Sequence, residues 1–255
     1  MLSIIALQIL VAWLLVRSFL SHGRGAQEPK RALVEAFGFG LLGFGIAMVL
    51  ELIFVGDPSQ VKHFASHGKQ ATELAAISFL VVGLIEELAK LLPLTWFVYK
   101  RPYFNTPTDG IIYYAFAGLG FGLLENILYT LTMGPAVGIA RLILMPYFHA
   151  ALTGIAGFYI VSHKLRRVSY LHVVAAIIVL VALHGLYDFL LESGNIGLIL
   201  LALPILALIV TGLFRYMAKA RKLDQELSLT VEATTGATLV PTSGTIPTDS
   251  PVIPS

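Results

Sequence analysis

The feature that most constrains this chain is a series of long apolar stretches that follow one another along most of its length. A transmembrane helix needs roughly 20 consecutive, mostly apolar residues. Stretches that meet this requirement lie at about 2–20, 32–55, 73–99, 110–132, 134–161, 170–191 and 194–217. Only 13% of the residues are charged, against about 25% in soluble domains. The sequence therefore predicts an all-α, polytopic bundle of about seven membrane-spanning helices embedded in a lipid bilayer.

The basic residues of the connecting segments gather on one side of this predicted bundle. They follow the first, third, fifth and seventh stretches, as Arg24, Lys30, Arg31, Lys100, Arg101, Lys164, Arg166, Arg167, Arg215, Lys219, Arg221 and Lys222. The opposite side has only Lys62 and Lys69. Because cytoplasmic loops are enriched in Lys and Arg, we expect the N-terminus outside, the C-terminus in the cytoplasm and a multi-pass location in the cell membrane. The cations form no single patch, so nucleic acid is not an expected partner.

Composition divides the chain into two parts. Residues 1–222 contain all the apolar stretches, and the polar motifs described below fall within about 73–191. Residues 223–255 are rich in Thr, Ser and Pro. A segment of this composition cannot bury a core, so we expect a disordered cytoplasmic tail.

The sequence excludes two common kinds of site. The chain has no cysteine, which rules out disulfides, thiolate nucleophiles and cysteine metal ligands. Gly118, Gly120 and Gly122 are spaced as in a nucleotide-binding loop, but they lie inside an apolar helix with no preceding strand. Small residues at this spacing let membrane helices approach closely, so these glycines predict helix packing.

Ionisable residues inside the third stretch indicate a functional site. A charged side chain at the bilayer centre costs roughly 3 kcal/mol on insertion scales, so groups kept there are candidates for chemistry. Glu86 and Lys90 are four residues apart and can pair on one helix face, whereas Glu87 points about 100° away from Glu86. One carboxyl group could be ionised beside Lys90 while the other stays neutral. This arrangement suits general acid–base catalysis by Glu86 or Glu87.

The next three stretches contribute polar residues at comparable depth. These are Glu125 and Asn126 in the fourth stretch, Arg141 and His149 in the fifth, and His184 and Asp188 in the sixth. Arg141, Met145 and His149 are spaced by four and are predicted to share one helix face. The same spacing lets Asp188 orient the His184 imidazole or share a ligand with it. Antiparallel neighbours could bring all these groups into one cavity, between the midplane and the outer surface of the bilayer.

The charges of these groups do not balance. Four carboxylates face two permanent cations: Glu86, Glu87, Glu125 and Asp188 against Lys90 and Arg141. Protonated carboxyl groups, an imidazolium or a bound cation must close the difference. His149, His184 and Asp188 with a water would suit a catalytic zinc. The chain has no HExxH helix, so zinc is a candidate cofactor that the residues do not by themselves require.

The polar residues form an ordered set of motifs: Glu86-Glu87-x-x-Lys90, Asp109-Gly110, Phe121-x-x-x-Glu125-Asn126, His149-x-x-x-Thr153 and His184-x-x-x-Asp188. In order and spacing, over about residues 30–215, this set resembles the PrsW family of intramembrane proteases. That family looks related to a broader clan of CAAX-processing and bacteriocin-related membrane proteases.

The resemblance implies proteolysis of a membrane-anchored protein in a bacterial plasma membrane, as in the first cleavage of an anti-sigma factor. In the related clan a glutamate activates water, and a histidine with a neighbouring amide stabilises the oxyanion. Members have been described both as metalloproteases and as glutamic proteases. The chain departs from the wider clan where Glu125-Asn126 stands in place of FxxxH and where Asp188 ends the motif usually written HxxxN. The roles therefore do not transfer residue by residue.

From the residues and the resemblance together we expect a peptidase mechanism. Glu86 or Glu87 would deprotonate the attacking water, while His149 and His184 would stabilise the oxyanion. The supporting roles are orientation of His184 by Asp188, an added donor from Asn126, and neutralisation of Glu125 or Asp188 by Arg141.

Two alternatives remain open from the sequence. Chains of intramembrane Glu, His and Asp also relay protons in ion-coupled transporters, although those proteins often show an internal repeat and none is visible here. The second alternative is a non-catalytic immunity or binding protein of the same fold.

Overall fold

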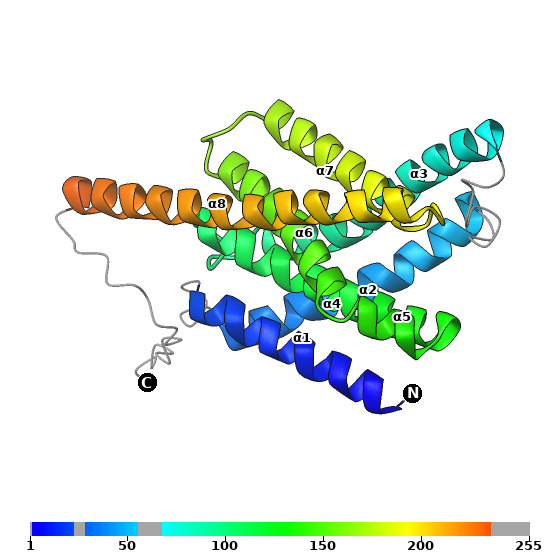
Figure 1. The fold of residues 1–255 in the computed structure, drawn as a ribbon. Helices are drawn as coiled ribbons and strands as arrows, with labels where there is room; N and C mark the ends of the chain where they lie inside the picture. Colours follow the sequence, from blue (N-terminus) through cyan, green and yellow to red (C-terminus); the bar gives the residue numbers. More distant parts are fainter. Residues whose placement is uncertain (1, 23–28, 56–67, 236–255) are drawn as a thin grey trace, which may run out of the picture.

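The structure is a computed structural model that describes residues 2–22, 29–55 and 68–235. The described residues are almost entirely helical (Figure 1). The helices are α1 (Leu2–His22), α2 (Lys30–Phe54), α3 (Lys69–Val98), α4 (Pro107–Met133), α5 (Pro135–Ala140), α6 (Leu144–Lys164), α7 (Tyr170–Leu191) and α8 (Ile196–Thr235). The predicted all-α class is confirmed.

Five of these helices, α2, α4, α6, α7 and α8, are long and apolar enough to cross a membrane. The apolar part of α1, Leu2–Arg17, is shorter. α3 has 30 residues, but its middle carries Glu86, Glu87 and Lys90, which are buried inside the protein. A bundle of membrane-spanning helices is therefore confirmed, whereas the count of seven spans and the orientation stay predictions.

The fifth apolar stretch is divided in two, which corrects the prediction of one helix over 134–161. α5 ends at Ala140, and α6 begins at Leu144. Pro146 stands in the first turn of α6, where its missing N–H would have no partner within the helix. Arg141 lies in the turn between the two helices, so it does not share a helix face with Met145 and His149 as predicted.

α4 and α6 form the buried centre of the molecule. Most of their residues are inaccessible, and α2, α1 and α8 pack around α4 (Figure 1). α2 and α8 instead expose many large apolar side chains, among them Leu52, Phe54 and Leu208. Such an exposed apolar surface is suited to contact with lipid, whereas the polar motifs lie on helices that face one another.

α4 begins at a capping box formed by Thr106 and Asp109. The Asp109 carboxylate accepts hydrogen bonds from the backbone N–H groups of Asn105 and Thr106 at 2.9 and 2.6 Å. The Thr106 hydroxyl accepts from the Asp109 N–H in return. This reciprocal pattern satisfies donors that a helix end leaves free, so Asp109 starts the helix and does not join the polar cluster.

Glycines set the distance between the helices that carry the polar motifs. A Cβ added to Gly118 of α4 would lie 2.4 Å from the carbonyl oxygen of His149. On α7, a Cβ at Gly185 would lie 2.7 Å from the carbonyl oxygen of Phe79 on α3. Backbones can meet this closely only where no side chain intervenes, which confirms the packing role predicted for Gly118.

α8 continues to Thr235 as one 40-residue helix. Helix therefore extends into the first part of the Thr/Ser/Pro-rich segment 223–255. Residues 236–255 lie outside the described part of the chain, and the division into bundle and tail stays a prediction.

Candidate active site

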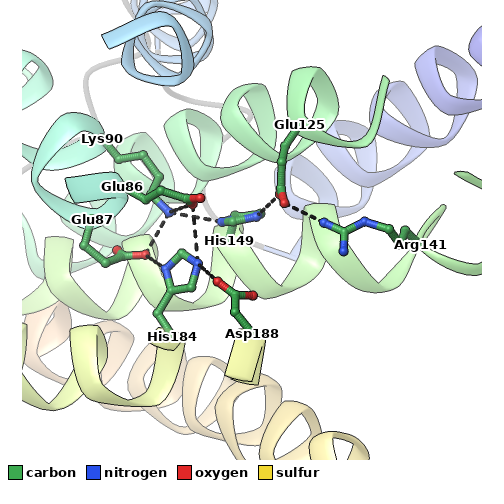
Figure 2. A network of polar contacts seen from close by, with 8 residues as sticks. All are labelled: Glu86, Glu87, Lys90, Glu125, Arg141, His149, His184 and Asp188. Carbon is green, nitrogen blue, oxygen red and sulfur yellow. Dashed lines mark hydrogen bonds and ion pairs between the residues drawn. The ribbon is translucent and has the colours of Figure 1, made fainter. Parts of the chain in front are cut away.

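Eight ionisable side chains from α3, α4, α6, α7 and the α5–α6 turn meet in the interior of the bundle (Figure 2). They are Glu86, Glu87, Lys90, Glu125, Arg141, His149, His184 and Asp188. Each was expected in the site from the sequence. The structure brings all of them into one connected network, although the roles assigned to them stay predictions.

The α3 residues form the first part of the network. The Lys90 ammonium donates a hydrogen bond to Oε1 of Glu87 at 2.7 Å and lies 3.7 Å from Oε2 of Glu86. Glu87 and Lys90 are fully buried, and Glu86 is 7% exposed. Spacings of three and four residues along one helix produce these pairs, as the sequence predicted for Glu86 and Lys90.

His184 of α7 is held between carboxylates on both sides of its ring. Nδ1 lies 2.7 Å from Oε1 of Glu87. Nε2 lies 3.4 Å from Oε2 of Glu86 and 3.3 Å from Oδ2 of Asp188. The predicted contact between Asp188 and His184 is therefore present, and the same ring nitrogen also faces α3.

His149 of α6 has a partner at each ring nitrogen. Nε2 lies 2.5 Å from Oε2 of Glu125, and Nδ1 lies 3.0 Å from the Lys90 ammonium. Because an ammonium group can only donate, Nδ1 accepts this hydrogen bond and the Nε2–H group donates to Glu125. Arg141 donates to the other oxygen of Glu125 at 2.5 Å, so of its two predicted partners it pairs with Glu125.

Aromatic rings enclose the two histidines. Phe148 meets the His184 ring edge to face at a centroid distance of 5.1 Å and stacks on Tyr187 at 4.2 Å. Phe121 lies 5.1 Å from the His149 ring, and the Lys90 ammonium sits 4.3 Å above the Phe121 centroid. These apolar walls keep the dielectric constant low, which strengthens the electrostatic interactions inside the cluster.

Three side chains of the cluster could hold a metal ion together. Glu86, His149 and His184 each offer a ligand atom, and these atoms lie within 4.8 Å of one another. Oε2 of Glu86 is buried without a hydrogen-bond partner, as a ligand oxygen would be before it binds. The set differs from the predicted trio, because Glu86 stands where Asp188 was expected.

Asn126 belongs to a neighbouring network and not to the two histidines. Its side-chain amide donates to the carbonyl oxygen of Gly138 at 3.4 Å. The Gln8 side chain of α1 donates to the backbone carbonyl oxygen of Asn126 at 3.4 Å and to the Thr130 hydroxyl at 2.6 Å. These contacts join α1 and α5 to α4, so they favour a structural role over the oxyanion donor expected from the sequence.

Glu51 of α2 is a carboxylate near the site that was not expected there. It is partly buried and lies within electrostatic reach of Glu125, Asp188 and His184. The spacing of small residues on α2 could have indicated that Glu51 faces the interior. Gly40, Gly43 and Ala47 are buried, and Glu51 continues their spacing of three and four residues along the same helix face.

Comparison with known proteins supports the interpretation of this cluster as the active site of an enzyme. The model of the PrsW family of intramembrane metalloproteases matches residues 28–214. Protease PrsW of Geobacillus kaustophilus (strain HTA426) is 36% identical over 184 residues, which cover 69% of this chain and 76% of that protein. Protease PrsW of Clostridioides difficile (strain 630) is 31% identical over 180 residues, or 67% of this chain and 71% of its own length. No solved structure matches the chain.

Proposed function

Because the chain belongs to the PrsW family of intramembrane metalloproteases, we propose that this cluster hydrolyses a peptide bond of a membrane-anchored protein. A first cleavage of an anti-sigma factor is the form of this reaction that the family resemblance favours. The observation that carries the proposal is the Glu86 carboxylate. Its Oε2 atom is buried without a hydrogen bond and faces Nε2 of His184 at 3.4 Å.

The three candidate ligands fit a divalent metal ion. Two imidazoles and one carboxylate are a common ligand set of catalytic zinc, with a further position left for water. When bound, such an ion polarises a carbonyl group and makes a bound water more acidic. Glu86, His149 and His184 would hold it, because their ligand atoms already lie within 4.8 Å of one another.

Carboxylates outside the ligand set fix both histidines. Glu125 accepts the Nε2–H of His149 at 2.5 Å, which leaves Nδ1 as the atom with a lone pair. Glu87 lies 2.7 Å from Nδ1 of His184, which directs Nε2 toward Glu86. Partners of this kind set the tautomer and the ring orientation of ligand histidines.

Glu86 and Glu87 therefore have different proposed roles. Oε1 of Glu87 is shared between Lys90 and His184, so this residue positions the ring. Glu86 lies near both histidines and would take part directly, as a metal ligand or as the base. Asp188, with a side chain 17% exposed, lies 3.3 Å from Nε2 of His184 and would take the proton of the attacking water in the metal-dependent version.

A metal-independent version of the mechanism uses the same residues. Glu86 would then accept the proton of the water itself, and His149 and His184 would stabilise the oxyanion. The two versions differ in their response to a chelator, which makes that treatment the deciding arm of the experiment.

The test is cleavage of single-span, membrane-anchored substrates by the purified chain, with and without chelator. We expect Glu86→Gln to lower cleavage by at least about a hundredfold, because Glu86 is a metal ligand in one version of the mechanism and the base in the other. Glu73→Gln is the matched control, because Glu73 lies on the same helix in an exposed pair with Lys69. Full activity of Glu86→Gln at normal protein levels would contradict the proposal. Loss with chelator that zinc restores would select the metal-dependent version.

A further inference from the structure

The Lys90 side chain contacts two of the three candidate metal ligands, Glu86 and His149. The Lys90 ammonium lies 2.7 Å from Glu87, 3.0 Å from Nδ1 of His149 and 3.7 Å from Glu86. Its side chain is completely buried. Figure 2 shows its nitrogen between the α3 carboxylates and the two imidazole rings.

This position matters because both ring nitrogens of His149 are in use. Nε2–H donates to Glu125, so Nδ1 is the nitrogen left with a lone pair for a metal ion. That same lone pair accepts the hydrogen bond from Lys90. A metal ion at Glu86, His149 and His184 and the ammonium at its present place would therefore compete for one atom.

We propose that Lys90 is an internal competitor of the metal ion, which must withdraw from His149 before the ligand set can close. This inference rests on the proposed metal-binding function of the cluster. Lys90 can make the move without losing all its partners. Its flexible four-carbon chain can keep the contact with Glu87 and the Phe121 ring while it releases Nδ1.

The competition sets how tightly the site holds a metal ion. A divalent ion next to an ammonium group is disfavoured by repulsion between like charges, strongly so in a buried site. Lys90→Met keeps much of the side-chain length and removes the charge and the donor. We therefore expect metal affinity to rise by about tenfold or more. Lys90→Arg keeps the charge in a bulkier planar group and is expected to lower the affinity.

The experiment is titration of the purified full-length chain with Co²⁺, followed by visible absorption, and with Zn²⁺ in competition with a chromophoric chelator. Lys69→Met is the control, since Lys69 is exposed and pairs with exposed Glu73 at the start of α3. A merely structural role for Lys90 would loosen the ligands and weaken binding in Lys90→Met. Tighter binding is therefore the signature of competition.

The outcomes separate this inference from the proposed function. Tighter binding by Lys90→Met, with wild-type behaviour of Lys69→Met, supports competition even if the wild type binds too weakly to measure. Equal or weaker binding by a folded Lys90→Met overturns the inference alone when the wild type binds metal. If Lys90→Met does not fold, Lys90→Arg is the deciding variant. Metal binding by Lys90→Arg that is at least as tight as that of the wild type then overturns the inference. Absence of binding in every variant removes the metal site and the competition together.

Discussion

At the scale of single residues, the site consists of two similar chains of contacts. Arg141 pairs with Glu125, which holds His149, and Lys90 pairs with Glu87, which holds His184. In each chain a cation supports a carboxylate, and the carboxylate orients an imidazole. Burying an unpaired carboxylate would be strongly destabilising, so each cation offsets the free-energy cost of burying its carboxylate.

Contacts within one helix could be predicted from the sequence, and contacts between helices could not. Spacing along the chain places Glu86 with Lys90 and His184 with Asp188, and both pairs are present. The pairs His149–Glu125 and His184–Glu87 depend on how each helix is rotated about its axis. A single sequence contains little information on that rotation when the helix is apolar on every face.

The first chain of contacts predicts the effect of Glu125→Gln. The amide cannot accept from His149 and Arg141 as strongly as the carboxylate does, so the ring orientation loosens. We expect a loss of roughly 10–100-fold in cleavage efficiency and in Co²⁺ affinity, the range typical of partners of ligand histidines. Both quantities are measured on the purified protein, with Glu73→Gln beside it. Unchanged values for Glu125→Gln would show that His149 needs no such support.

At the scale of helices, the crossing of α3 and α7 places Glu87 beside His184. Gly83 and Gly185 meet there, since a Cβ on Gly83 would lie 2.9 Å from the backbone nitrogen of Gly185. Small residues at the crossing were predictable as packing positions. Which helices cross at them was not, because the same residue types also occur at the α4–α6 crossing, where Gly110 and Gly157 lie close together.

Gly185→Ala tests whether this crossing controls the site. The added methyl group would meet backbone atoms of Phe79 and Leu80, which cannot move aside without shifting α3. We expect destabilisation of about 1–3 kcal/mol and a fall in cleavage, because His184 moves away from Glu87. Thermal unfolding in detergent and cleavage assays measure the two effects.

Gly38→Ala is the matched control for that substitution. Gly38 is exposed on α2, and a Cβ there meets nothing within 4 Å. Alanine is also the better helix former, so stability should stay equal or rise slightly. Wild-type stability and cleavage in Gly185→Ala would mean that the α3–α7 distance does not govern the cluster.

At the scale of the whole molecule, an apolar surface surrounds a largely apolar interior that encloses the polar cluster. Many large apolar side chains are exposed on α2, α3, α7 and α8, such as Trp96 and Ile178. Composition was sufficient to predict this arrangement, because a chain with 13% charged residues has too few polar side chains to cover its surface. Composition does not fix where α1 packs, which depends on the buried contact of Gln8 with Thr130.

Membrane orientation is the property of the whole chain that connects the site to its substrate. Seven spans, with the basic connections in the cytoplasm, would place residues 56–72 outside and the end of α8 inside.

The chain lacks cysteine, so a single introduced thiol has no background from the chain itself. We expect a membrane-impermeant maleimide to label Ser66→Cys in intact cells. Gln225→Cys, at an exposed position of α8, should react only after permeabilisation. An even number of spans between the two positions would make both thiols react under the same condition. That result would contradict the seven-span topology and, with it, the predicted position of the cluster between the midplane and the outer surface of the bilayer.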